Sequence, residues 1–441
     1  VYADCLNREE LLPTLKDVDY AYYLIHSMRS KKEEFIEKDQ IAAKNFRDSA
    51  EHHGVKRIIY LGGLGEKNDR MSPHLRSRRE VGIILSQGSI PAIRVRAAII
   101  IGAGSASYEL MKSLVMNNRF IPFLPEFNSL CQPVAIRDVI KYLVGVMETP
   151  DLGSRVFPIG GKDVLPYKEL ILRFAKILNR RIRFIDVSWV PIPVDWMCRI
   201  YAYWLHCFIS IPVNITSLLL SSLKTDVVCG NDEISTILPF EPLDFVTAVQ
   251  WAQEKEKSSR VFSHWSDVPP ENMSDLLPLC EFESSEFIIE EHEIDIPVAP
   301  EHVFPVVCQI GGKYGWNHAN ILWEIRGLID RLLGGVGLQR GRRDPTDLRV
   351  GDSVDFWRVE RLEPNRELLL RAEMITPGLS WLEFQLNPDQ NGGTRLTLKA
   401  HFIPKPFWGN LYWTVLSTFH AYIFKGMLEF FKKKSLQTTA N

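Results

Sequence analysis

Residues 57–85 read RIIYLGGLGEKNDRMSPHLRSRREVGIIL, and this stretch decides the fold of the N-terminal half. It opens with an apolar run at 58–61, which is short enough for a buried strand of a parallel sheet. Gly62, Gly63 and Gly65 follow, and glycine lets the backbone come close to a ligand or adopt positive φ. The stretch therefore predicts a strand that ends in a turn open to a ligand.

The same stretch then predicts a helix that starts at Ser72 and Pro73, because serine caps helices and proline suits the first turn. This helix carries His74, Arg78 and Glu80 on adjoining turns. A strand end, a glycine turn and a charged helix start form the carboxyl edge of an open α/β sheet, where such folds bind their ligands. We therefore expect the functional site here.

Helical and strand patterns alternate through the rest of the N-terminal half. The predicted helices cover 4–16, 33–53 and 166–178, and the predicted strands cover 20–25, 92–101 and 180–187. Strands separated by helices favour βαβ units, and these build a parallel, Rossmann-like α/β sheet that is covered on both faces.

Composition limits the classes of function. The chain has 441 residues, enough for two or three domains, and its 52 basic and 54 acidic residues provide no overall basic field for nucleic acid. Its seven cysteines form no C-x-x-C pair and have no histidine spacing typical of a zinc site. We expect reduced thiols, a cytoplasmic location, no bound metal and no nucleic-acid partner.

The chain starts with Val1, and residues 1–15 read as a strand end followed by a helix. A parallel α/β sheet normally begins with a strand, a glycine-rich turn and a helix that binds the phosphates of a nucleotide. We therefore expect the N-terminal sheet to lack its first βα unit, and this chain to bind a dinucleotide weakly or not at all.

Several segments in a fixed order carry a resemblance. They are DCLN, YYLIHSM, YLGGLG, SPHLRSRREVG, RVRAAIIIGAGSASYE, QPVAIRDVIKYL and RVFPIGGKDVLPYKEL. Together they resemble the extended, atypical short-chain dehydrogenases/reductases, in the NAD(P)-binding, NmrA-like branch, over about residues 1–178. The resemblance implies NAD or NADP as the cofactor. The phosphate-binding G-x-x-G-x-x-G of that family falls before Val1.

The resemblance also implies which residues contact the cofactor. Asp4 matches the acidic residue that hydrogen-bonds the adenine amino group, and Cys5 is expected to pack beside the ring. The remaining implied contacts come from the ends of later strands: His26, Ser27, Gly62, Gly63, Ala97, Ala98 and Ile99.

The catalytic positions of that family differ in this chain. Gly62 or Gly63 stands at the serine position, His74 at the tyrosine position and Arg78 at the lysine position. A histidine titrates near neutral pH and can donate a proton, whereas an arginine stays charged and binds ribose or phosphate without proton transfer. The alternative is that His74 and Arg78 only cap and solvate the helix start.

Residues 187–252 are predicted to form a helical region that covers the substrate. Within them, residues 200–223 carry no formal charge, and a run of this length suits a bilayer. Pro212, His206 and Asn214 interrupt the run. A peripheral membrane contact through 189–223, as an interfacial hairpin, is therefore the alternative, and the protein would then be membrane-associated.

A second domain of a different type follows a charged, Pro- and Ser-rich linker. Its alternating strands and a long last helix at about 407–434 predict an α+β grip that can enclose an apolar cavity. The segments WEIRGLIDRLLGG, RGRRDPTDLRVGDSVDFWRVE and YWTVLSTFHAYIFKGM resemble the C-terminal domain often fused to bacterial atypical reductases, which is similar to the START/polyketide-cyclase helix-grip fold. This resemblance implies a lipid or another apolar ligand.

Two groups of side chains in this domain are open to two interpretations. The cluster Arg340, Arg342, Arg343 and Arg349 either meets an anionic head group or forms a solvated surface turn. The four tryptophans, Trp316, Trp323, Trp357 and Trp381, either line the cavity or pack in the core.

The predicted domains are 1–186 for NAD(P) binding, 187–252 for the helical cover, 253–286 for the linker and 287–435 for the helix-grip domain. Two functions fit them. The first is an oxidoreductase that acts on a hydrophobic carbonyl or hydroxyl compound, with the C-terminal domain delivering or sensing the substrate. The alternative is a catalytically silent NAD(P)-binding sensor or assembly factor with an apolar ligand in its C-terminal domain.

We expect limited proteolysis to cut first within residues 254–279, because this segment has few apolar anchors, and to leave two stable fragments. Gel electrophoresis with mass spectrometry of the fragments measures the sites. Uniform resistance across the segment would count against two separable domains.

Overall fold

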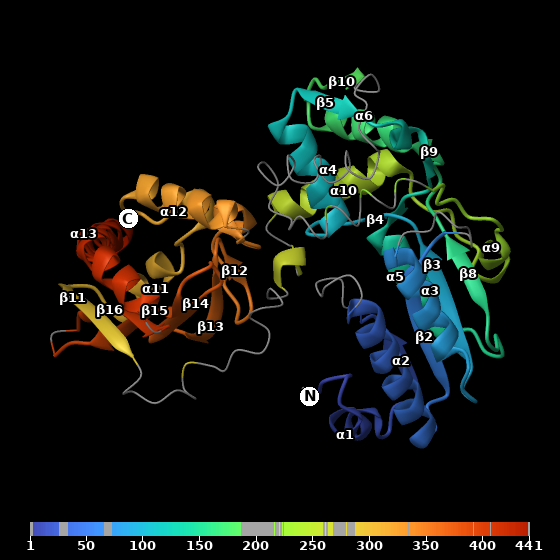
Figure 1. Ribbon diagram of the computed structural model, residues 1–441, viewed down its shortest axis with the longest axis horizontal. Coiled ribbons are helices and arrows are strands. Elements are labelled where there is room, and N and C mark those ends of the chain that lie inside the picture. The colour runs from blue at the N-terminus through green and yellow to red at the C-terminus, as the bar shows by residue number, and fades with distance from the viewer. Residues whose placement is uncertain are drawn as a thin grey trace. The chain divides into compact units, whose positions relative to one another are not determined.

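The computed structural model describes residues 3–25, 34–65, 73–186, 216, 220, 223, 225–258, 261, 263–267, 279, 287–333, 335–390, 392–405 and 407–439. The chain forms two compact units, 1–258 and 259–441, which Figure 1 shows from blue to red. Helix α10, Phe245–Lys257, runs through the first residues of the predicted linker 253–286.

The N-terminal unit alternates helices and strands. Its strands are β1 (Tyr20–Tyr23), β2 (Arg57–Gly63), β3 (Ala92–Ala97), β4 (Ile100–Ile101), β5 (Phe120–Phe123), β6 (Leu130–Cys131), β7 (Val134–Ala135), β8 (Val156–Ile159), β9 (Leu165–Pro166) and β10 (Arg183–Asp186). Its helices are α1 (Arg8–Leu11), α2 (Glu34–His52), α3 (Pro73–Leu85), α4 (Ala106–Asn117), α5 (Ile136–Glu148), α6 (Tyr167–Ile177), α9 (Glu233–Ile237) and α10, with 3-10 turns η1 (Leu12–Leu15) and η2 (Pro125–Asn128).

A parallel sheet in the order β1-β2-β3-β8 forms the centre of this unit. Ile58 and Tyr60 of β2 pack with α2 and α3 on one face, and Ile59 packs with α5 on the other. A strand that is buried on both faces needs a continuous apolar run, which β2 has. The prediction of a parallel sheet with helices, which fits a Rossmann-like fold, is therefore confirmed.

The predicted strand 92–101 is interrupted at Ala98 and Ile99. β3 stays in the central sheet, whereas β4 pairs with β7, and Val134 N donates to Ile99 O at 2.9 Å. The chain therefore leaves the sheet at the residues that the resemblance places beside the nicotinamide.

The buried carboxylate of Asp138, in the first turn of α5, connects distant segments. Its Oδ2 accepts a hydrogen bond from Leu243 N at 2.8 Å, and its Oδ1 lies 3.2 Å from Lys141 Nζ. Arg137 beside it lies over the ring of Trp251 in α10, 4.4 Å from the ring centroid. This helix start therefore joins α5 to the segment that leads into α10.

The C-terminal unit is built on an antiparallel sheet in the order β11-β16-β15-β14-β13-β12. Its strands are β11 (Ile288–Ile296), β12 (Ser353–Val354), β13 (Trp357–Glu363), β14 (Glu367–Ala372), β15 (Gly378–Pro388) and β16 (Thr394–Pro404). Its helices are α11 (Pro300–Val307), α12 (Asn320–Leu332) and α13 (Trp408–Thr439), with 3-10 turns η3 (Trp265–Asp267), η7 (Gly312–Tyr314) and η8 (Gly337–Arg340).

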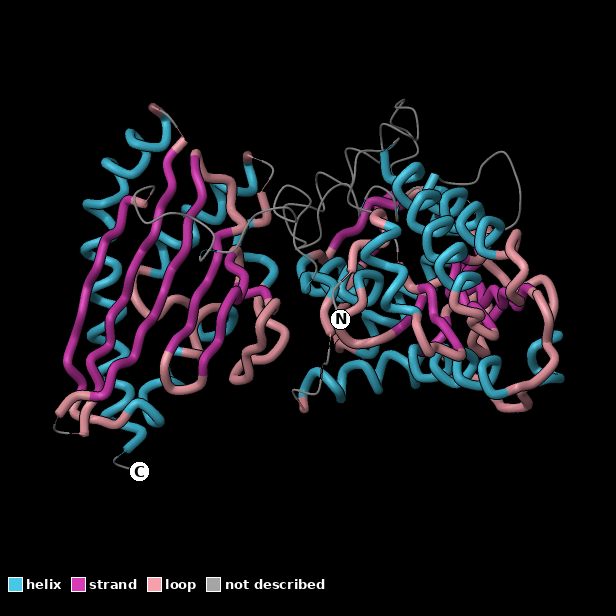
Figure 2. Tube along the Cα trace, turned by 90° about the horizontal axis from the view of Figure 1, so that it is seen from below, coloured by secondary structure: helices cyan, strands magenta, loops and turns pink. Residues whose placement is uncertain are grey.

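Figure 2 shows the magenta strands of this sheet side by side. One core joins residues of α11, α12 and α13 to alternate residues of the strands, such as Leu382 and Phe384 with Phe424 and Phe431. The prediction of a separate antiparallel-sheet domain with a long last helix is therefore confirmed.

The predicted head-group or solvated role of the arginine cluster is wrong for three of its members. Arg340 is buried and pairs with Glu373, and Arg343 pairs with Asp352 at 2.9 Å. Arg342 donates to the carbonyls of Cys308 and Ile310 at 2.6 and 2.7 Å. These guanidinium groups form ion pairs and hydrogen bonds within the domain, because a charged group that loses contact with water needs such partners.

Within the described residues, no helix has both the length and the apolar character that crossing a bilayer requires. Most of the segment 189–223, for which a membrane contact is the alternative, lies outside the described residues.

We expect Glu373→Ala to lower the free energy of unfolding of the C-terminal unit by on the order of 3–5 kcal/mol, because it leaves two buried guanidinium groups without their carboxylate. Glu373 accepts from Arg358 Nε at 2.6 Å and also pairs with Arg340. Urea unfolding measures the change.

The matched control is Glu363→Ala. Glu363 Oε2 lies 3.3 Å from Arg366 Nη1, and the Arg366 side chain is 77% exposed, so this ion pair is at the surface. We expect this variant to cost less than about 1 kcal/mol. Equal losses in the two variants would contradict a structural role for the buried pair.

Candidate functional site

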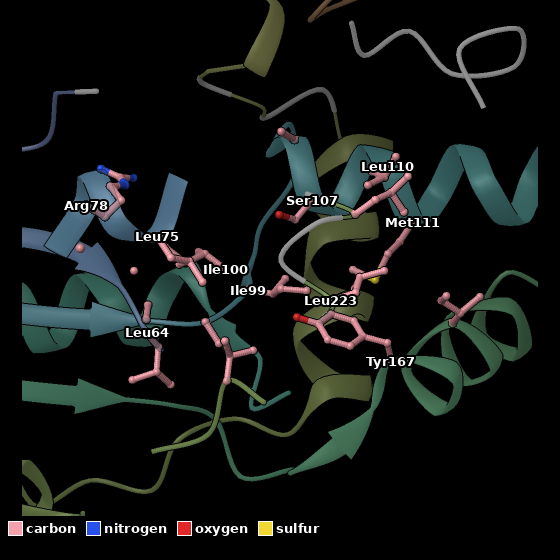
Figure 3. A pocket seen from close by; sticks show the side chains of 18 of the residues that line it. Leu64, Leu75, Arg78, Ile99, Ile100, Ser107, Leu110, Met111, Tyr167 and Leu223 are labelled. Carbon is pink, nitrogen blue, oxygen red and sulfur yellow. The ribbon is translucent and has the colours of Figure 1, made fainter. Parts of the chain in front are cut away.

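A pocket of ≈ 280 Å³ lies at the carboxyl ends of β2 and β3. The turn after β2, the start of α3, the 97–100 segment and α4 line it, together with Tyr167 and Ile171 of α6. Most of the lining side chains are apolar, as Figure 3 shows for Leu75, Ile99 and Met111. The pocket is therefore placed where open α/β sheets bind ligands, and it suits an apolar group.

The glycines at the end of β2 leave no room for a larger residue. A Cβ at Gly62 would lie 2.8 Å from the Tyr60 ring, and a Cβ at Gly63 would lie 2.8 Å from Leu75 Cδ2. Gly65 has φ 154°, a conformation that other residues rarely adopt. The backbone of this turn therefore borders the pocket directly, and glycine rather than serine stands at its end.

Arg96 fixes this turn, and the sequence analysis did not select it. Its Nε donates to Gly63 O at 3.0 Å, and its guanidinium also bonds Gly65 O. Two carbonyls on one guanidinium hold the glycine turn against β3.

Arg78 of α3 lies at the pocket, and Figure 3 shows it at one end of the cavity. Its side chain is half-buried, and its Nε is buried without a hydrogen-bond partner among the described residues. Its backbone carbonyl accepts from Tyr60 OH at 2.9 Å. The charged side chain of Arg78 therefore lies near the glycine turn and interacts with the Tyr60 hydroxyl.

Two polar residues of the pocket, Ser107 and Tyr167, were missed by the sequence analysis. Figure 3 shows the Tyr167 ring extending from α6 into the pocket. Burial, and then the neighbouring Cys131 thiol, raise the pKa of Tyr167 well above its ordinary value, so the hydroxyl keeps its proton. Tyr167 is far from β2 in the sequence, and only the packing of α6 brings it here.

The pocket brings together six of the residues selected from the sequence. They are Gly62, Gly63, Arg78, Ala97, Ala98 and Ile99. His26 and Ser27 lie outside the described residues, and so does the side chain of His74, although α3 begins just before it.

Asp4 and Cys5 are not among the residues that line this pocket. Asp4 Oδ1 accepts from Leu6 N at 2.9 Å, and Cys5 O accepts from Asn45 Nδ2 of α2 at 3.0 Å. Burial, and then the charge of Asp4, raise the pKa of the Cys5 thiol. Asp4 therefore stabilises the turn before α1, and Cys5 attaches this turn to α2.

Helix α4, which carries part of the pocket lining, is attached to α10 by a charged cluster. Lys112 Nζ lies 2.7 Å from Glu256 Oε1 and 3.7 Å from Glu109 Oε2. Tyr108 OH donates to Glu256 Oε2 at 3.2 Å. The position of this pocket wall therefore depends on ionised groups.

Among the described residues, no group of three or more His, Cys, Asp or Glu side chains is arranged to hold a metal ion. The thiols of Cys5, Cys131, Cys229 and Cys308 are free.

One protein family matches the chain. The model described as a protein of unknown function, DUF2867, matches residues 288–427, which contain the sheet β11–β16 and most of α13. No curated protein matches the sequence.

Solved structures similar to the N-terminal part include a nucleoside-diphosphate-sugar epimerase from Staphylococcus aureus, at 15% identity and TM-score 0.45, covering 56% of this chain and 82% of that one. The triphenylmethane reductase of Citrobacter sp. has 13% identity and TM-score 0.45, with 57% and 82% covered. The Bordetella bronchiseptica enzyme WbmG, in complex with NAD and UDP, has 12% identity and TM-score 0.44, with 60% and 82% covered. At these scores the fold assignment rests on the strand order of the chain itself.

Burial raises the pKa of Glu109 to about 7, against the attraction of Lys112 and with a further contribution from Glu256. The folded state therefore binds more protons than the unfolded state between about pH 4.5 and pH 7, and stability falls as the pH rises through this window. We expect Glu109→Gln to be more stable than the parent at pH 8 by on the order of 1–2 kcal/mol, and about equal to it at pH 4.

Urea unfolding at the two pH values measures this difference. Glu9→Gln, at an exposed position in α1, is the control and should keep the pH profile of the parent. A Glu109→Gln variant that is less stable than the parent at pH 8 would show that the ion pair with Lys112 dominates instead.

Proposed function

We propose that the N-terminal unit is an NAD(P)-dependent oxidoreductase that acts on a hydrophobic carbonyl or hydroxyl compound. The observation that carries this proposal is the apolar pocket at the carboxyl ends of β2 and β3, lined by Ala97, Ala98 and Ile99. Such a pocket excludes water from a substrate and binds it through its apolar surface.

The residues present fit the nicotinamide end of the cofactor on two observations. A Cβ at Gly62 or Gly63 would meet Tyr60 or Leu75, so glycine is what lets the backbone of this turn border the pocket. Arg78 lines the pocket, and a guanidinium binds ribose or phosphate oxygens. When bound, NAD(P) supplies or accepts the hydride.

The chain has to hold or move one proton at the substrate oxygen. His74, which follows Pro73 at the start of α3, is the proposed donor by its match to the family's tyrosine position. Tyr167 is the second candidate, because it lies in the pocket and its raised pKa keeps its hydroxyl protonated. Arg78 is proposed to orient the cofactor, because it cannot transfer a proton at neutral pH.

A catalytically silent NAD(P)-binding sensor or assembly factor is the second candidate function. The observation that favours it is the tight packing at Gly62 and Gly63, which leaves no place for the serine hydroxyl of the related enzymes. In this case the pocket would bind cofactor without turnover.

For the C-terminal unit, we propose a helix-grip domain that holds an apolar ligand. Support comes from α13, whose residues pack against the sheet and also border a cavity. A helix-grip domain requires a ligand cavity between its sheet and its last helix.

We expect His74→Ala to lower the turnover of NADPH or NADH with apolar ketones by roughly 10²- to 10⁴-fold, the usual contribution of a general acid, while the affinity for cofactor stays nearly unchanged. Arg78→Ala should weaken cofactor binding first. Stopped-flow absorbance of the reduced cofactor and calorimetric titration measure the two effects.

Two control variants replace an exposed histidine and an exposed arginine of the same unit. His52→Ala in the last turn of α2 and Arg76→Ala at an exposed position of α3 should leave both quantities unchanged. A loss in Tyr167→Phe with full activity in His74→Ala would assign the proton to Tyr167. Cofactor binding without turnover of any ketone in the parent protein would replace the oxidoreductase by the silent alternative.

A further inference from the structure

A second cavity, of ≈ 340 Å³, lies in the C-terminal unit between α12, α13 and the sheet. Its lining is almost entirely apolar, and three of the tryptophans selected from the sequence, Trp323, Trp357 and Trp381, border it. Trp316 belongs to the same core as Trp323 and Trp357, does not line the cavity, and donates to Asp355 at 3.0 Å. A volume of this order lies within the range of about 300–1,000 Å³ for small-molecule sites.

The lining residues keep several N–H groups that are buried without a hydrogen-bond partner among the described residues. They are Nε1 of Trp323, Nε1 of Trp357, and Nε and Nη1 of Arg326. Trp323 and Arg326 are close to one turn apart on α12 and therefore share a face of that helix. All these groups are donors, so any group that pairs with them must be an acceptor.

The charge of Arg326 is only partly compensated by the protein. Its Nη2 donates to Ile375 O at 2.8 Å, and its Nη1 is 3.7 Å from Asp330 Oδ1, too far for a hydrogen bond. The Asp330 oxygens already accept from the backbone of Ile375 at 2.6 Å and of Gly337 at 2.8 Å. Arg326 therefore keeps donors and positive charge for an anion.

The other titratable side chains of the cavity are paired within the protein. His401 Nε2 lies 2.7 Å from Glu383 Oε2, and His420 Nδ1 lies 3.3 Å from Glu290 Oε2. Neither glutamate lines the cavity. Among the described lining residues, Arg326 is therefore the charged group that is not matched by a hydrogen-bonded partner of opposite charge.

Residues that both line the cavity and reach solvent mark its opening. Ile325 and Ile329 of α12 are 49% and 46% exposed, and Phe419 of α13 is 48% exposed. All three are apolar, so an aliphatic chain crosses this opening without losing contact with apolar surface.

We propose that this cavity binds a single-chain carboxylic acid, with the carboxylate at Arg326 and the indole N–H groups and the aliphatic chain among the apolar residues. A carboxylate only accepts hydrogen bonds and carries the charge that Arg326 needs, whereas a neutral apolar molecule would leave these donors unpaired. This inference rests on the proposed apolar-ligand function of the C-terminal unit, and it does not depend on oxidoreductase activity in the N-terminal unit.

Calorimetric titration of the full chain with dodecanoic acid, below its micelle concentration, tests the proposal. The expected result is one molecule per chain in this cavity, with Arg326→Gln weakening the affinity by about 10- to 100-fold, the range for a lost charge-assisted hydrogen bond. Dodecanol has the same chain without the charge, and its affinity should be nearly the same for the parent and Arg326→Gln.

Three further variants locate the site and control for folding. Leu416→Trp fills the cavity from α13 and should abolish binding, Arg326→Lys should retain part of it, and Arg366→Gln, at an exposed arginine of the same unit, should change nothing. Thermal unfolding confirms that each variant is folded. Equal affinity for the acid and the alcohol, unchanged binding in Leu416→Trp, or no binding to the parent would each overturn the proposal.

Discussion

Burial of β2 on both faces is the constraint on which the N-terminal unit depends. Helices α2 and α3 cover one face and α5 covers the other, so the strand is reachable only at its ends. At its start, Arg57 donates to the carbonyls of Val146 and Thr149 at the end of α5, both at 2.7 Å, and closes that edge. A ligand therefore has access at the carboxyl end, where the glycine turn leaves the backbone open.

The sequence predicted the parallel sheet well because the residues that define each strand and its turn are neighbours in the chain. The apolar run of β2 and its glycine turn are adjacent in the chain, and so are the residues at the end of β3. The interruption at Ala98 and Ile99 was not predicted, because it depends on pairing between β4 and β7, which are far apart in the sequence. Tyr167 was missed for the same reason.

Charge patterns were less informative than apolar patterns. Clustered arginines indicate a surface when their partners are unknown. Glu373, which pairs with Arg340, comes from a distant segment, and Asp352, which pairs with Arg343, stands in the same segment without any local pattern that marks it as the partner. In contrast, period-two alternation predicted the antiparallel sheet, because the apolar residues within each strand mark the face that is buried. Asp4 and Cys5 were selected by resemblance, and their bonds to neighbouring residues and α2 do not bring them to the pocket.

The unpaired indole and guanidinium donors beside the C-terminal cavity have an energetic consequence for the free protein. Each buried donor without a partner costs about 1–3 kcal/mol relative to a satisfied one, and a folded domain has only about 5–15 kcal/mol of net stability. These unpaired donors therefore lower the free energy of unfolding of the C-terminal unit relative to an interior in which every donor is paired.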